Sequence, residues 1–155
     1  EEVVLEITDA ASFTTVWEEA YNLEPGTVFT VVMTEAALED YLNEQVGADS
    51  DDALMDFDVT LDRTATIGFS LTIPGINVGV DASVTFDIFV TEGGQLMVET
   101  LSAAAGDQEI PADLLDILNG RFAEAVTGDY DYTGNVSFTD VVVARGEIRA
   151  TGVVE

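Results

Sequence analysis

The sequence predicts an α+β fold in which a long, strongly curved antiparallel sheet wraps a helix, with two further short helices. Strict alternation of apolar and polar residues over residues 64–91, interrupted at Pro74-Gly75, is typical of a hairpin with one buried face. A helical apolar period follows Pro111. The order of elements lacks the strand–helix–strand alternation and the phosphate loop of a doubly wound nucleotide fold, which is therefore excluded.

The composition indicates one acidic domain. The chain has 155 residues, enough for a single core over residues 1–155, and no apolar run near the length of a membrane span. Its 31 acidic residues against four arginines give a net charge of −27, which argues against nucleic acid and against strong binding to an anionic membrane surface. Absence of cysteine excludes disulfides and thiolate metal sites.

The charge balance also suggests a habitat. A lysine-free, acid-rich chain is typical of proteins from saline surroundings, because salt shortens the range of the repulsion between carboxylates. The alternative is an acidic surface that serves solubility only.

The first third of the chain is expected to form a strand over residues 3–8, a helix over 12–21, a strand over 27–33 and a helix over 34–46. Either Ser12, or Thr15 with Glu18 as a capping box, begins the first helix. Thr34 is a good N-cap for the second helix, and Gly47 is expected to end it.

The acidic segment at residues 47–56 is expected to be a loop. It fails the EF-hand pattern, because Ala53 and Leu54 stand where an oxygen ligand and a glycine are required. A solvated loop is therefore predicted, with a weak cation site as the alternative, and no cofactor or metal is expected elsewhere in the chain.

The long hairpin has a self-consistent register. If Ile73 faces Ile76, then Leu71 faces Val78 and Phe69 faces Val80, so that every inward pair is apolar. Because proline suits a longer turn better than a two-residue one, the alternative is an even shift of register, which preserves the facing sets. A glycine pair at residues 93–94 then leads into a strand over residues 95–105.

Two charges fall on this inward face when the pairing is continued. Arg63 is placed opposite Phe86, and Glu99 opposite Ile88, one on each side of the central strand. Buried charges need a partner, so the two are a candidate polar spot in an apolar interior. The alternative is a β-bulge that turns one or both to solvent.

The last third is expected to form a helix over residues 111–126 and a final hairpin. Pro111 suits the first helical position, and an apolar stripe from Leu114 to Val126 is long enough to lie across several strands. Apolar residues at 136–143 and 148–154, separated by Arg145-Gly146, predict two antiparallel strands. The helix is expected to pack against the concave face of the sheet.

Three segments carry a resemblance to a known family. They are MTEAALEDYLNEQV (residues 33–46), GDQEIPADLLDILNGRF (106–122) and VSFTDVVVARGEIRATG (136–152). Over residues 28–154 the chain resembles small bacterial envelope proteins of the LmeA-like and YpmS-like kind, which are similar to the tubular lipid-binding superfamily. The resemblance implies a curved sheet wrapped around a helix, with an acyl chain between them, and an extracytoplasmic location with any targeting segment removed.

The resulting hypothesis is a non-enzymatic protein that binds or carries an apolar ligand, a lipid or fatty acyl chain, between the long hairpin and helix 111–126. Burial of methylenes would drive binding. The alternative is a structural or assembly module of the cell envelope with a filled core. The candidate ligand-binding residues are Ile67, Phe69, Leu71, Val78, Val80, Val84, Phe86, Leu118 and Phe122, with Arg63 and Glu99.

Overall fold

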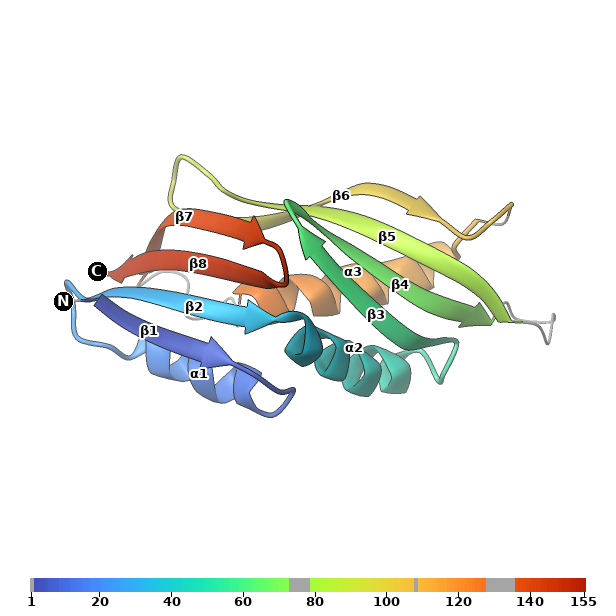
Figure 1. Ribbon diagram of the computed structural model, residues 1–155, viewed down its shortest axis with the longest axis horizontal. Coiled ribbons are helices and arrows are strands. Elements are labelled where there is room, and N and C mark those ends of the chain that lie inside the picture. The colour runs from blue at the N-terminus through green and yellow to red at the C-terminus, as the bar shows by residue number, and fades with distance from the viewer. Residues whose placement is uncertain (1, 73–78, 108, 128–135) are drawn as a thin grey trace.

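The computed structural model describes residues 2–72, 79–107, 109–127 and 136–155. These residues form three helices and eight strands, which confirms the predicted α+β class (Figure 1). The elements are β1 (Glu2–Ile7), α1 (Ser12–Tyr21), β2 (Val28–Thr34), α2 (Glu35–Asp49), β3 (Leu54–Asp62), β4 (Thr64–Thr72), β5 (Gly79–Val90), β6 (Leu96–Ala104), α3 (Ala112–Thr127), β7 (Val136–Ala144) and β8 (Glu147–Val154).

The strands form two four-stranded sheets that follow one another along the molecule. The first has the order β1-β2-β8-β7 and the second the order β3-β4-β5-β6. Only the β1–β2 pair is parallel among the described strands. The sheets meet where the Arg63 N–H donates to the Val143 carbonyl (2.8 Å) and the Gly146 N–H to the Leu61 carbonyl (2.9 Å). The long sheet expected from the sequence is therefore divided at a seam.

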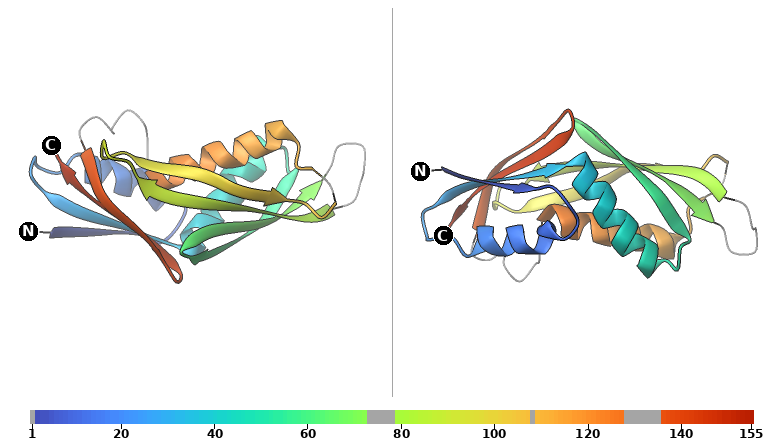
Figure 2. Two further views of the ribbon diagram at one scale, coloured as in Figure 1. Left: turned by 90° about the horizontal axis from the view of Figure 1, so that it is seen from above. Right: turned by 60° about the horizontal axis from the view of Figure 1, so that its bottom comes forward.

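The helices cover one side of both sheets. Figure 2 shows α1 beside the first sheet, with α2 and α3 beside the second. Helix α1 buries an apolar face that includes Phe13 and Trp17. Helix α3 buries Leu118 and Phe122 toward the second sheet. The apolar faces of the three helices and the inward faces of the strands form one core.

The helix ends differ in part from the prediction. Thr34 does cap α2, because its hydroxyl oxygen accepts from the Ala37 N–H at 3.1 Å. The helix does not end at Gly47, however, but continues to Asp49, and the chain reverses through the positive φ angles of Asp51 and Asp52. Much of the expected acidic loop is thus helix or strand.

Helix α1 uses neither predicted N-cap. Its N-cap position is Ala11, which makes no side-chain cap, and Ser12 is already helical. The Ser12 N–H donates instead to the Asp9 carboxylate at 2.9 Å, and the Ser12 hydroxyl donates to the Asp9 carbonyl. A local turn at Asp9 therefore satisfies the Ser12 N–H in place of a side-chain N-cap.

The hairpin register is shifted by an even step from the first pairing considered. Leu71 faces Val80 rather than Val78, and Ile67 faces Val84. The alternative that allowed such a shift is correct, and the inward side chains of both strands remain inward because the side-chain period is two. The Pro74-Gly75 turn and Val78 lie outside the described residues.

Candidate functional site

The residues expected to line a cavity pack against one another instead. Phe86 of β5 and Phe122 of α3 are stacked with ring centroids 4.5 Å apart. All predicted lining residues that the structure describes belong to the core or border on it. The buried ones are Ile67, Phe69, Leu71, Val84, Phe86, Leu118 and Phe122, and Val80 is partly buried. This part of the interface between the second sheet and α3 is therefore filled by side chains.

The inward placement of Arg63 and Glu99 is wrong, and the alternative, in which the side chains are turned to solvent, holds for both. Arg63 lies exposed in the tight turn between β3 and β4, with a φ of 66°. Glu99 is exposed on β6 and faces Asp87, because β6 pairs with β5 one residue away from the predicted register. A shift of one residue reverses which face of a strand points inward, so the apolar face carries Val98 in place of Glu99.

A small apolar pocket does lie at the seam between the sheets. It has a volume of about 60 Å³ and is lined by the start of β6, the end of α3 and the start of β7. Leu96, Val136 and Phe138 form its buried walls. A dry cavity of about 150 Å³ holds one benzene, so this pocket is too small for a whole lipid.

Two aromatic side chains of α1 fix the end of α3 beside this pocket. The Trp17 indole N–H donates to the Ala125 carbonyl at 3.0 Å, and the Tyr21 hydroxyl donates to the Thr127 carbonyl at 2.5 Å. Thr127 itself lines the pocket. Because the last carbonyls of a helix have no partner within it, these bonds satisfy groups that burial would otherwise leave unpaired. The helical period puts both aromatics on the buried face of α1, but the sequence gives no sign of these partners.

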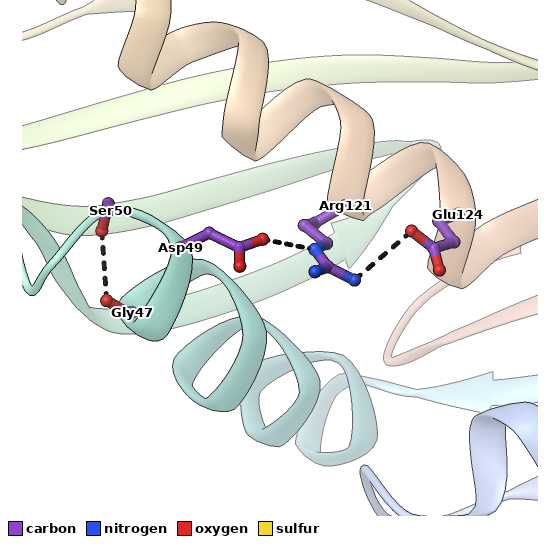
Figure 3. A network of polar contacts seen from close by, with 5 residues as sticks. All are labelled: Gly47, Asp49, Ser50, Arg121 and Glu124. Atoms are coloured by element: carbon purple, nitrogen blue, oxygen red, sulfur yellow. Dashed lines mark hydrogen bonds and ion pairs between the residues drawn. The ribbon is translucent and has the colours of Figure 1, made fainter.

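A charged contact joins α2 to α3 at the surface (Figure 3). The Arg121 guanidinium donates to the Asp49 carboxylate at 2.6 Å and lies 3.5 Å from Glu124. The bond to Asp49 is the main reason that the pKa of Arg121 is raised. The nearby Tyr41 hydroxyl also has a raised pKa, caused first by burial and then by the Glu124 charge. The contact is structural, and sequence reasoning missed it.

Helix α2 also closes the edge of the second sheet at β3. Three of its side chains accept backbone N–H groups of that strand: Glu35 from Leu61 (2.8 Å), Glu39 from Val59 (3.0 Å) and Asn43 from Phe57 (3.0 Å). We call these three side chains the α2 comb. Their spacing of four residues is the signal in the sequence, because it puts three acceptors on one helix face.

One member of the α2 comb, Glu39, has a raised pKa. Burial is the largest cause of the raised pKa of Glu39, and the neighbouring Asp58 and Glu35 carboxylates add to it. The bond from the Val59 N–H acts in the opposite direction. Glu39 is therefore held where its negative charge is disfavoured.

The outer face of the second sheet carries a separate polar groove. It is lined by Asp56, Asp58 and Asp81 together with parts of β4, and its volume is about 360 Å³. Within the described ranges, no group of three His, Cys, Asp or Glu side chains is arranged to hold a metal ion. No described helix is both long enough and apolar enough to cross a membrane.

The fold and the seam pocket together define an α+β protein with an apolar core between sheets and helices. No protein-family model matches the chain, and no curated protein matches it. Among solved structures it is similar to a crystal structure of lipopolysaccharide binding protein, with a TM-score of 0.39 and 10% identity. The match covers 86% of this chain and 50% of that one, so the chain spans about half the length of that protein.

Proposed function

We propose that this protein is a non-enzymatic binder of an apolar ligand, a lipid or fatty acyl chain, whose end enters the seam pocket. The observation that carries the proposal is the pocket itself. Its walls at Leu96, Val136 and Phe138 belong to the apolar core, so a chain entering there passes directly into the interface between sheet and helix. Residues Gly94 and Gln95, in the turn before β6, form part of its rim.

The pocket volume sets how the ligand must be held. By the benzene comparison a pocket of about 60 Å³ holds about two methylenes, and at about 0.8 kcal/mol each these contribute about 1.6 kcal/mol, so the pocket alone binds a chain more weakly than about 1 mM. Carriage at lower concentrations requires a longer buried stretch. We propose that the remaining methylenes separate α3 from β6, and the exposure of residues 99–104 supports this, because exposed residues add little to the packing between strand and helix.

We further propose the finer identity that the sequence motifs imply, a protein of the LmeA-like and YpmS-like kind located outside the cytoplasm. Its role as a carrier and not an enzyme is supported by the absence of His, Lys and Cys from the sequence. Acid–base chemistry would then depend on carboxylates alone.

The test is mass spectrometry of an organic extract of the purified protein, with native mass spectrometry for stoichiometry. We expect a bound apolar molecule, or its uptake from a mixed pool of fatty acids and phospholipids. Leu96→Phe should reduce uptake by filling the pocket, and Leu96→Ala should increase it by enlarging the pocket. Leu5→Ala, at a partly buried leucine of β1, is the matched control and should leave uptake unchanged.

A second candidate is a structural or assembly module of the cell envelope. The specific observation in its favour is the filled interface, in which the Phe86–Phe122 stack occupies the centre of the predicted site. The carrier proposal would be overturned in favour of this one if the spectrum is ligand-free before and after incubation with the lipid pool and neither Leu96 variant changes ligand uptake.

A further inference from the structure

The two sheets have four edge strands, which are β1, β7, β3 and β6. Three of them are short or tied down. The α2 comb occupies β3, and β7 is held by the bond from the Phe138 N–H to the Gly94 carbonyl (2.8 Å) and by the contact of Val143 with Arg63. Strand β1 has six residues, and its charged residues are Glu2 and Glu6.

 A short edge strand with two charged residues is protected against pairing with another chain, so β1 is not available for strand addition.

Strand β6 lacks these protections. Its nine residues include no lysine and no proline, and its single charge is Glu99. Among the described residues, its backbone pairs with β5 alone, and Figure 1 shows it at the free margin of the second sheet. Met97 and Leu101 expose 41% and 53% of their surface. An edge with unpaired N–H and C=O groups and exposed apolar side chains is a template for an added strand.

The part of this edge with regular pairing is short, and its side chains alternate between the two faces of the sheet. Leu101 has no partner on β5, because the register shifts between Thr85 and Phe86, so residues 96–100 form the segment available for regular pairing. Val98 lies on the apolar face opposite Ile88, and Glu99 lies on the outer face opposite Asp87. An added strand would therefore meet an apolar position and an acidic position in alternation.

The acidic position identifies the chemistry of the partner. Asp87 and Glu99 are directly opposite one another, and like charges at such a cross-strand position destabilise the pair. A Lys or Arg beside Glu99 would relieve that repulsion. A second copy of this chain is disfavoured, because each copy has a net charge of −27.

We propose that the outer edge of β6, over residues 96–100, binds an extended segment of a partner protein in which apolar residues alternate with Lys or Arg. The segment adds a fifth strand to the second sheet. Its apolar side chains extend the face that carries Val98, and a basic side chain lies beside Glu99. This inference is independent of the apolar-ligand proposal and specifies the surface that an assembly module requires.

The probe is a nine-residue peptide of alternating Lys and Val. It is compared with two peptides of the same sequence, one N-methylated at every Lys and one at every Val, so that each has lost the N–H donors of one of its two edges. N-methylation keeps the charge but removes the donors that strand addition needs. We expect the unmodified peptide to bind and to slow amide hydrogen exchange in β6. N-methylation on the peptide edge that faces β6 should abolish the binding and the slowed exchange. If both N-methylated peptides bind as well as the unmodified one, or if protection is confined to other strands, the binding is electrostatic attraction only and the proposal is overturned.

A charge reversal on the protein supplies the second arm. Glu99→Lys should weaken peptide binding about tenfold, since it replaces an attractive cross-strand pair by a repulsive one. Glu44→Lys, at an exposed position of α2, changes the net charge equally and should have little effect. Equal effects of the two variants would contradict a site at β6. Neither Glu99 nor Glu44 lines the seam pocket, so lipid extraction tests the apolar-ligand proposal independently of these variants.

Discussion

At the scale of single residues, Arg121 carries the clearest polar contact between helices. It joins the end of α2 to α3 through Asp49, in an ion pair whose side chains are partly exposed. Asp49 closes the C-terminal turn of α2, where a negative charge is unfavourable to the helix dipole. The cation of Arg121 therefore offsets a local cost as well as forming a bond.

We expect Arg121→Gln to lower the free energy of unfolding by about 1 kcal/mol, because an exposed or half-exposed ion pair contributes about that much at most. Urea unfolding at low salt is the measurement. Arg145→Gln is the matched control, since it removes the same charge from an exposed turn residue. An equal loss in both variants would show that net charge, and not the contact with Asp49, sets the effect.

Glu39 gives a residue-scale prediction for pH. Its pKa is raised above the usual 4.5, chiefly by burial, so the folded protein binds a proton more readily than the unfolded chain. The contribution of Glu39 to stability is therefore present at low pH and is lost as the pH rises from 4.5 through the raised pKa. Glu39→Gln keeps an oxygen to accept the Val59 N–H but removes the titrating charge.

We expect Glu39→Gln to be more stable than the parent protein by about 0.5 kcal/mol near neutral pH, with the difference vanishing toward about pH 4.5. Urea unfolding over this range, in salt to preserve solubility, provides the measurement. Asp40→Asn, at the next and exposed position, controls for the loss of one charge. A difference that is independent of pH would show that Glu39 titrates alike in the folded and unfolded states.

At the scale of elements, the α2 comb is what attaches the second helix to the second sheet. The helix presents three acceptors to the edge of β3, and the apolar positions on the same helix, including Leu38 and Leu42, are fully buried. Burial supplies most of the attachment energy, while the comb satisfies strand N–H groups that would otherwise compete for another strand.

We expect the double substitution Glu35→Ala, Asn43→Ala to lower the free energy of unfolding by about 1–3 kcal/mol, since two strand N–H groups lose their acceptors. Hydrogen exchange should become faster at Leu61 and Phe57 while the amides of β4 stay protected. Asp40→Ala with Glu44→Ala, two exposed positions of the same helix, is the control pair. Unchanged exchange at both amides would show that solvent already reaches this edge.

The sequence determines elements more securely than pairings. Alternation and helical periodicity identified the strands, the three helices and the inward set that includes Ile67, Phe86 and Phe122, because each depends on a repeat within one segment. The register of β6 and the division of the strands between two sheets depend on a bulge and on contacts between distant segments. A one-residue error there moved Glu99 from the outer face to the inner one.

The candidate site was less predictable than the core. Periodicity finds which side chains point inward, but whether they leave a cavity depends on how α3 approaches the sheet, which no local pattern encodes. The seam pocket combines residues from β6, α3 and β7, and its walls at Leu96 and Phe138 are 42 positions apart in the numbering. The α2 comb was not predicted either, although the four-residue spacing of its polar acceptors places them on one helix face.

At the scale of the whole molecule, the dominant feature is negative charge without compensation. The chain has 31 acidic residues, and among the described residues ion pairs form only at Arg121 and Arg149. Most carboxylates therefore repel one another across the surface. The Debye length is about 10 Å at 0.1 M salt and about 3 Å at 1 M, so molar salt removes most of this repulsion.

We propose that the protein is adapted to saline surroundings, and we expect its melting temperature to rise by about 5 °C or more between about 0.1 M and about 1 M NaCl, equivalent to about 2 kcal/mol. Because screening saturates as the Debye length shrinks, the rise should level off near 1 M, whereas a salting-out effect on apolar surface would continue to grow. Glu44→Lys with Asp40→Lys, both at exposed sites on α2, should make the slope shallower by lowering the net charge. A melting temperature that is flat over this range would mean that the acidic surface serves solubility alone.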